Sequence, residues 1–220
     1  CHQIPGESPP TDAPSLTHVA GNMHFDWLVD WLSRETPSQE GALRRMPHFT
    51  LSKSEAESIA IYLFAQSKSI KRKTVDSKKT DLAKGKELLL TTGCLACHKV
   101  GAVGESGLFG GGDLTAISTK RPREFFAHWL TAPEELNPQH RMPVFQFSKD
   151  ELRDLAAHLA SLGSTPEPTE PPPGTAEQIA IGRQLFEKHH CAACHGSTGV
   201  EGRVPQREFA ANINWNESCA

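Results

Sequence analysis

The sequence predicts a helical chain built from a repeated unit, and three observations support this prediction. Apolar residues recur at helical spacing in several segments. Two of these segments begin with a Ser followed three positions later by a Glu, the spacing of a capping box: Ser52 with Glu55, and Ser148 with Glu151. Landmarks also recur at a period of about 97 residues, and self-similarity of this kind indicates tandem modules.

The most detailed repeat is a helix predicted over 82–89 and again over 179–186. Each copy carries a glycine at the same position, Gly85 in one and Gly182 in the other. A glycine inside a helix costs about 1 kcal/mol relative to alanine. Its recurrence therefore predicts that another backbone passes close to each glycine, and chance coincidence is the alternative.

A second set of matches relates the first part of the chain to its middle. Segment 25–32, which contains Trp27-Leu28, corresponds to segment 123–130. The sequence Arg-Met-Pro-x-Phe then occurs at 45–49 and at 141–145, and each copy leads into one of the capped helices. The two parts are therefore expected to share one order of elements.

Four of the six cysteines form two Cys-x-x-Cys-His motifs, at 94–98 and 191–195. This five-residue pattern indicates covalent attachment of haem. Two thiols on one helical turn can bond to the two vinyl groups, and the adjacent His is then held beneath the iron as its proximal ligand. The predicted attachment and ligand residues are Cys94, Cys97, His98, Cys191, Cys194 and His195.

Two other interpretations of the paired cysteines are available. A zinc site would need a second pair of ligands within each unit, and the sequence offers none at suitable spacing. A thioredoxin-like redox pair would follow a strand of a βαβ unit, and no strand pattern precedes either motif. Haem attachment is the interpretation that both exclusions favour.

Two methionines are predicted to be the sixth ligands of haem irons. Met142 lies 44 residues after His98, and Met46 lies 44 residues after His2. A thioether sulfur is a soft ligand that raises the reduction potential of a haem. The alternative is that each methionine fills a gap in a core.

Three further residues bear on the sixth ligand. Met23 has no counterpart in the second repeat and is expected to pack in the interior. His48 and His140 flank the two ligand methionines and could ligate in their place, which would give bis-His iron. They do not occupy equivalent positions, so this interpretation ranks below the Met ligands.

The register of the repeat also gives an interpretation of the two ends. Cys1-His2 corresponds to Cys97-His98, so Cys1 is expected to hold a haem and His2 to ligate its iron. A lipidated first cysteine is the alternative. Cys219 could start another attachment motif, stay a lone thiol or form half of a disulfide, and a fourth haem is the least favoured of these.

The order of glycine-containing helix, Cys-x-x-Cys-His motif, loop, helix, Met-Pro loop and final helix resembles the class I cytochrome c family. Residues 81–163 cover the whole pattern. The resemblance implies an all-α fold of tandem cytochrome c domains, in which the first and last helices cross beside the haem. It implies the axial pairs His98 with Met142 and His2 with Met46, and places His195 on a third iron. The family packs an aromatic residue of the last helix against the helix glycine. Tyr62 offers one, but His158 stands near the corresponding place, which predicts a looser crossing there.

The repeat and the composition suggest five segments. We expect a first, N-terminally truncated domain at 1–67, a basic linker at 68–80, a complete domain at 81–163, a Pro-rich linker at 164–174 and a C-terminally truncated third domain at 175–220. The basic linker is expected to be solvated, although a docking patch for an acidic redox partner would have the same composition. The Pro-rich linker is expected to act as a semi-rigid spacer.

The function that follows is electron transfer by a multihaem c-type cytochrome with two to three haem c groups and their iron. The net charge of −3 gives no case for nucleic-acid binding, and the longest apolar run, Ile59 to Ala65, is too short to cross a membrane. Redox proteins are the expected partners, and maturation of haem c implies a periplasmic or other extracytoplasmic location in a bacterium. The alternatives are a haem peroxidase, an electron-conduit module fused to catalytic domains of a larger oxidoreductase, and a zinc-binding structural module.

Overall fold

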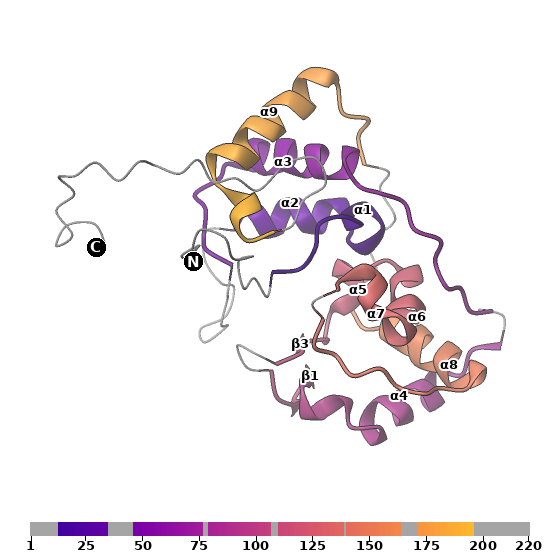
Figure 1. Ribbon diagram of the computed structural model, residues 1–220. Helices are drawn as coiled ribbons and strands as arrows, with labels where there is room; N and C mark the ends of the chain where they lie inside the picture. Colours follow the sequence, from indigo (N-terminus) through magenta and orange to yellow (C-terminus); the bar gives the residue numbers. More distant parts are fainter. Residues whose placement is uncertain are drawn as a thin grey trace, which may run out of the picture.

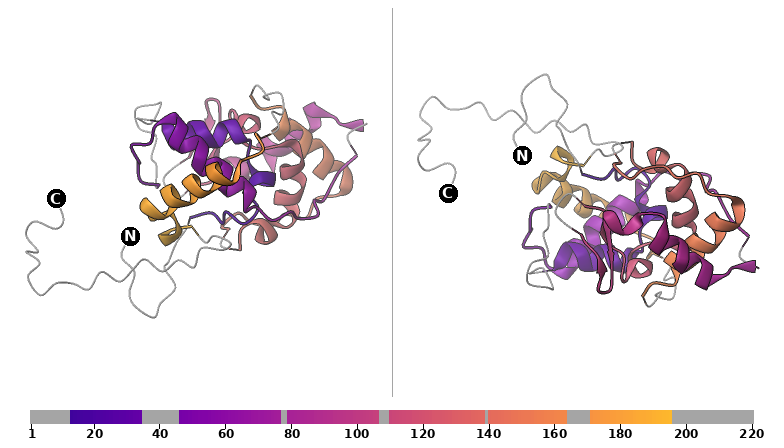
Figure 2. Two further views of the ribbon diagram at one scale, coloured as in Figure 1. Left: turned by 90° about the horizontal axis from the view of Figure 1, so that it is seen from above. Right: turned by 90° about the horizontal axis from the view of Figure 1, so that it is seen from below.

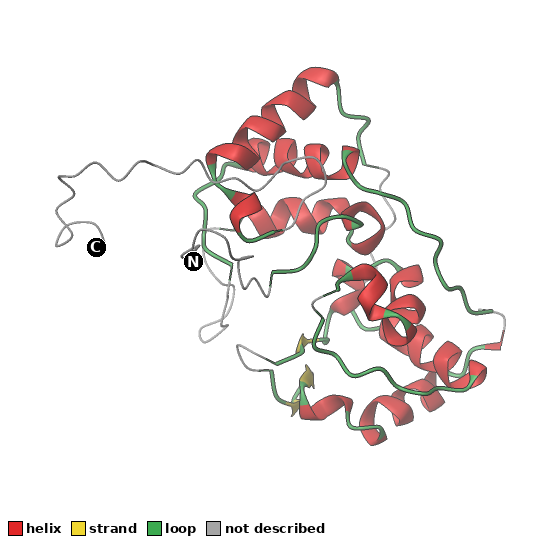
Figure 3. Ribbon diagram, in the orientation of Figure 1, coloured by secondary structure: helices red, strands yellow, loops and turns green. Residues whose placement is uncertain are grey.

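A computed structural model describes residues 13–34, 46–76, 79–106, 110–138, 140–163 and 171–195. These residues are mainly helical (Figures 1 and 3). The helices are α1 (Val19–Asn22), α2 (Phe25–Ser33), α3 (Lys53–Ala65), α4 (Leu82–Thr91), α5 (Ile117–Lys120), α6 (Arg123–Thr131), α7 (Pro133–Leu136), α8 (Lys149–Ala160) and α9 (Ala176–Lys188). Short 3-10 turns lie at Cys94–Ala96 and Cys191–Ala193.

A small sheet follows the first attachment motif, where the sequence predicted only a loop. It consists of β1 (His98–Val100), β2 (Val103–Gly104) and β3 (Gly112–Asp113) in the order β2-β1-β3. Strand β1 is antiparallel to β2 and parallel to β3, with His98 opposite Gly112. The sheet thereby fixes the backbone that carries the first motif histidine.

The apolar side chains of the described residues gather in two cores. The first core is made mainly by α2 and α3, with Val19 of α1 and Phe186 of α9. The second core is made by α4, α6, α7 and α8. The segment predicted as a third domain therefore contributes its largest buried side chain, Phe186, to a core built mostly from residues before 64.

Helix α4 packs along α8 through its glycine (Figure 1). A Cβ added at Gly85 would overlap the carbonyl oxygen of Asp154 and lie 2.7 Å from His158 Cβ. The backbone that was predicted to pass close to this glycine is therefore that of α8. The prediction of a looser crossing beside His158 is wrong. At the other glycine crossing the aromatic residue is Tyr62, and its Cβ would also lie 2.7 Å from a Cβ added to the glycine.

That other crossing joins α9 to α3, which lie side by side in all three views of the fold (Figures 1 and 2). A Cβ added at Gly182 would overlap the carbonyl oxygen of Ser58 and lie 2.7 Å from Tyr62 Cβ. Ser58 and Tyr62 are the repeat counterparts of Asp154 and His158, each 96 residues earlier. The two helix pairs therefore use equivalent residues.

The predicted capping boxes are present at both final helices. Ser52 accepts from the Glu55 backbone N–H, and Ser148 accepts from that of Glu151. In each box the glutamate carboxylate accepts in turn from the serine backbone N–H, at 2.9 Å in α3 and 2.8 Å in α8. These exchanges satisfy donors that a helix N-terminus would otherwise leave unpaired.

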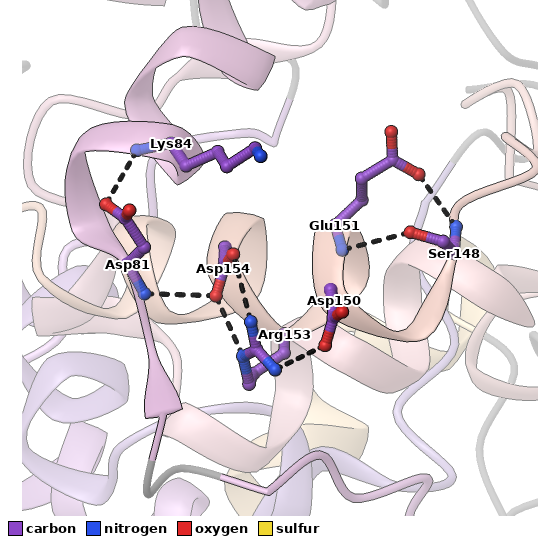
Figure 4. Close-up of polar contacts among 7 residues, drawn as sticks. All are labelled: Asp81, Lys84, Ser148, Asp150, Glu151, Arg153 and Asp154. Atoms are coloured by element: carbon purple, nitrogen blue, oxygen red, sulfur yellow. Dashed lines mark hydrogen bonds and ion pairs between the residues drawn. The ribbon is translucent and has the colours of Figure 1, made fainter.

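The start of α4 is tied to α8 by one buried carboxylate (Figure 4). The Asp81 backbone N–H donates to Asp154 Oδ1 at 3.0 Å, and Arg153 Nε donates to the same oxygen at 2.8 Å. Asp81 also caps its own helix, because its side chain accepts from the Lys84 backbone N–H. The bond to Arg153 is the main reason that the pKa of Asp154 is lowered.

The predicted basic linker contacts the second core and helix α1 along the part that the structure describes. Ile70 and Val75 pack against the second core, while Lys71 and Lys73 point to solvent. Arg72 Nη2 donates to Asn22 Oδ1 of α1 at 2.8 Å. Arginine and lysine are therefore used differently here, the first for a contact and the second for solvation.

No helix in the described ranges combines the length and the apolar character that crossing a membrane would require.

Candidate haem sites

Both attachment motifs fold in the same way, directly after a glycine-containing helix. In each motif the first cysteine begins a 3-10 turn, Cys94–Ala96 or Cys191–Ala193, and the second cysteine follows the end of that turn. The residue before each turn adopts the left-handed conformation, Gly93 at φ 88° and His190 at φ 53°. Cys94, Cys97, Cys191 and Cys194 are all free thiols, so none is bonded to its partner in the motif.

The histidine of the first motif is held by a backbone carbonyl. His98 Nδ1 lies 3.2 Å from the carbonyl oxygen of Gly112. Because a carbonyl oxygen can only accept, Nδ1 carries the proton and Nε2 of the neutral ring presents a lone pair. Burial lowers the pKa of His98, and the Gly112 carbonyl opposes part of that shift, so the ring is neutral at pH 7.

The histidine of the second motif makes the same kind of bond to a distant part of the chain. His195 Nδ1 lies 2.9 Å from the carbonyl oxygen of Pro14, 181 residues earlier. Burial lowers the pKa of this ring as well, with the Pro14 carbonyl acting in the opposite direction. His195 is thus also neutral and presents Nε2.

These donor sets fit an iron porphyrin. A metal-ligating histidine usually donates its other ring N–H to a carbonyl or carboxylate, which fixes its tautomer and orientation. His98 and His195 both meet this condition, and each stands directly after a pair of free thiols. The ring of His98 also packs on Gly111, where an added Cβ would overlap the ring and lie 2.5 Å from Nε2.

Met142 lies at the edge of the second core, which Cys94 also borders. Trp129 Nε1 donates to Met142 Sδ at 3.0 Å, and the Trp129 ring stacks on Phe125 with centroids 5.4 Å apart. His140 donates through Nδ1 to the Met142 carbonyl oxygen at 2.9 Å. The sulfur is therefore positioned by α6 and by its own loop.

Met46 lies at the edge of the first core, which Cys191 and Ala192 also border. Its neighbour His48 is exposed and uses Nε2, at 2.6 Å from the carbonyl oxygen of Arg34. The two histidines that flank the methionines thus use different nitrogens for their backbone contacts. Met23 packs against the first core, in line with the interior role that the sequence suggested.

Two observations bear on the non-haem interpretations of the motifs. Burial raises the pKa of Cys191 to about 11, whereas a reactive dithiol depends on a lowered thiol pKa. Within the described ranges, no three or more His, Cys, Asp or Glu side chains group together in a way that could hold a metal ion.

Some predicted site residues lie outside the described residues, namely Cys1, His2 and Cys219. Other contributors were missed at the level of sequence. Trp129 was noted only as part of a repeated helix, and nothing in its spacing singles out a contact to sulfur. The capping box of Thr175 and Gln178 at the start of α9 was also missed, although its sequence pattern is present.

Comparison with known proteins identifies part of the chain. Residues 82–163 match the family described as Cytochrome c. These residues run from α4 to the end of α8, and so include the first attachment motif, Met142 and the second core.

Over a longer stretch the chain is similar to two subunits from Helicobacter pylori, both named Cbb3-type cytochrome c oxidase subunit CcoP. The protein from strain 52 is 30% identical over 167 residues, which are 74% of this chain and 53% of that protein. The protein from strain ATCC 700392 / 26695 is 30% identical over 149 residues, 67% of this chain and 48% of that protein. The chain thus spans about half the length of the curated relatives it matches.

No solved structure is a significant match to the chain. The family match, the helical order and the held histidine agree for one segment. Residues 82–163 carry the match to the Cytochrome c family, and that family implies covalently bound haem c with iron.

Proposed function

We propose that this chain is a multihaem electron carrier in which Cys94 and Cys97 bind haem covalently and His98 and Met142 are its axial ligands. The observation that carries the proposal is the bond from His98 to the Gly112 carbonyl. This bond leaves the lone pair of Nε2 available to bind iron, beside two thiols. Met142 and Cys94 border the same core. The second motif supplies a further haem through Cys191, Cys194 and His195.

The attachment chemistry is balanced without an additional reactant. Each thiol adds across one vinyl double bond, so that sulfur bonds to one carbon and the thiol hydrogen passes to the other. No electrons are gained or lost. Cys94 begins the 3-10 turn, Cys97 follows its end, and His98 comes directly after Cys97.

The protein tunes the iron through its axial ligands, their hydrogen bonds and burial. When bound, the haem supplies a one-electron couple between ferrous and ferric iron. Met142 provides a soft sulfur that favours the ferrous state, and the Trp129 N–H withdraws electron density from that sulfur. His98 stays neutral because its pKa is lowered.

A second candidate function is supported by the relatives, whose names place them in an oxidase. On this view the chain is the electron-conduit part of a larger extracytoplasmic oxidoreductase and delivers electrons to a partner. The exposed lysines of the predicted linker, Lys68, Lys71 and Lys73, offer a positive surface to an acidic redox protein. Since haem c is matured outside the bacterial cytoplasm, we place this function in the periplasm or at the cell surface.

Equilibrium redox titration of the matured chain tests the proposal. We expect reversible one-electron steps, low-spin ferric spectra and no turnover of peroxide, because a Met ligand closes the sixth site. Replacement of Met142 by Ala should lower the potential of one haem and leave the pigment covalently bound. High-spin iron with peroxide turnover in the unaltered chain would instead favour a peroxidase.

A further inference from the structure

We propose that one haem site is assembled from two segments far apart in the sequence, with Cys191, Cys194 and His195 on one side and Met46 on the other. This inference rests on the proposed function, because it requires the second motif to carry haem. It departs from the pairing of Met46 with His2 that the spacing in the sequence favours.

The helix in front of the second motif packs like the helix in front of the first. Helix α9 packs on α3 as α4 packs on α8, with a glycine at each crossing. Gly182 meets Ser58 and Tyr62, and these are the repeat counterparts of the residues that Gly85 meets. The segment with the second motif therefore stands, relative to α3, where 82–98 stands relative to α8.

Helix α9 also buries an apolar side chain in the core, as α4 does. Phe186 is 1% exposed in the first core, and its counterpart Leu89 is 2% exposed in the second. The Phe186 ring lies 5.6 Å from that of Tyr62, centroid to centroid. Since Phe186 is among the largest fully buried side chains of the described residues, its contact with α3 is an interior contact.

The motif histidine makes an equivalent hydrogen bond at both sites. His195 donates to the Pro14 carbonyl, and His98 donates to the Gly112 carbonyl. Pro14 and Gly112 each stand two residues before a Leu-Thr pair, so they are counterparts in the repeat. The bond that orients the first proximal ligand is thus reproduced between parts of the chain 181 residues apart.

Met46 occupies a position equivalent to that of Met142. Met46 and Cys191 border the first core, just as Met142 and Cys94 border the second. Trp27 and Trp31 stack at 5.3 Å, as do their counterparts Phe125 and Trp129 at 5.4 Å. The surroundings of the first core thus supply counterparts of Met142 and of the stacked pair beside it, and α9 and the attachment motif come from the distant segment.

The test uses full-length chains matured in a host that attaches haem c, all with Met142→Ala so that Met46 is left as the sulfur ligand in question. The far-red charge-transfer band of ferric Met-ligated haem reports the Met46 ligand. We expect the band in this background and its loss with Met46→Ala or with Cys191→Ser and Cys194→Ser. A band that survives the paired serine change and disappears with His2→Gly would overturn the proposal, as would the absence of any band in the background.

Gly182→Val provides a second readout that leaves the thioethers in place. The added side chain should displace α9 from α3 and abolish the band, while Gln184→Val on the exposed side of α9 should preserve it. An unchanged band in the Gly182 variant would contradict the proposal.

Two controls separate the remaining explanations. Peptide mass spectrometry shows whether the Cys191–His195 peptide carries haem; if it does not, the proposed function fails for that motif. Mixing a Met46→Ala chain with a paired-serine chain tests assembly between copies. Each chain alone lacks one half of the site, so a band that reappears on mixing would show assembly between two chains and overturn the proposal for a single chain.

Discussion

Single hydrogen bonds decide which ligand atoms are available at these sites. The carbonyls of Gly112 and Pro14 fix the tautomers of His98 and His195, and the Trp129 N–H points at the sulfur of Met142. The sequence identifies the histidines and the methionine through motif and spacing. It does not identify Trp129 or the carbonyl acceptors, because those contacts depend on how distant loops fold back.

Replacement of Trp129 by Phe should lower the potential of the haem bound at the first motif. The indole N–H withdraws electron density from Met142 Sδ, so its loss makes the sulfur a better donor to ferric iron. A hydrogen bond of about 0.5–1.5 kcal/mol corresponds to on the order of 20–60 mV for one electron. Redox titration measures the change. A potential that rises, or does not move, would show that the indole does not act on the ligand sulfur.

Replacement of Asp154 by Ala should destabilise the chain at pH 7 by about 1–3 kcal/mol, since the Asp81 N–H and Arg153 lose their acceptor. The pKa of Asp154 is lowered in the folded state, chiefly by Arg153. Its contribution is therefore complete above the unfolded pKa of about 4 and is lost as the pH falls through the folded value. The difference in unfolding free energy between the unaltered chain and the Asp154→Ala variant, measured by urea unfolding, should become smaller as the pH falls. Ser58→Ala, at the counterpart position in the repeat, is the control. A difference in unfolding free energy that does not depend on pH would refute the stabilising role of the ionised Asp154 carboxylate.

Two helix crossings organise the described fold. The helix in front of each motif, both capping boxes and the close approach at Gly85 and Gly182 follow from local patterns, which is why the sequence predicts them. The strands of the small sheet have only two or three residues, too few for a periodic signal. The partner of α9 could not be predicted, because a repeat shows that helices are equivalent but does not say which copy packs on which.

Gly85→Ala distinguishes packing from helix propensity. Propensity alone would stabilise α4 by about 1 kcal/mol. The added Cβ would overlap the Asp154 carbonyl, and overpacking of this kind costs about 1–3 kcal/mol. We expect net destabilisation in urea unfolding followed by circular dichroism. Lys86→Ala, on the exposed side of the same helix, should have little effect, and a stabilised Gly85 variant would show that the crossing tolerates a side chain.

The helices around the first core and those around the second core contact each other through α1, α2 and α5. Arg121 Nη1 donates to the Asn22 carbonyl at 2.8 Å, and Lys120 Nζ lies 4.5 Å from the centre of the Trp27 ring. Burial lowers the pKa of Lys120 to about 7, and the neighbouring Arg121 adds to the shift. No sequence pattern predicts this contact, because it consists of a few polar groups at helix ends and in loops.

Across the whole molecule, the account depends on haem being bonded to the paired thiols. Peptide mass mapping of the chain, matured in a host that loads a reference cytochrome c, tests this most directly. We predict that the peptides containing Cys94–His98 and Cys191–His195 each carry the mass of one haem, which remains after denaturation in acidified organic solvent. Both peptides at their unmodified mass, beside a fully loaded reference protein, would contradict it.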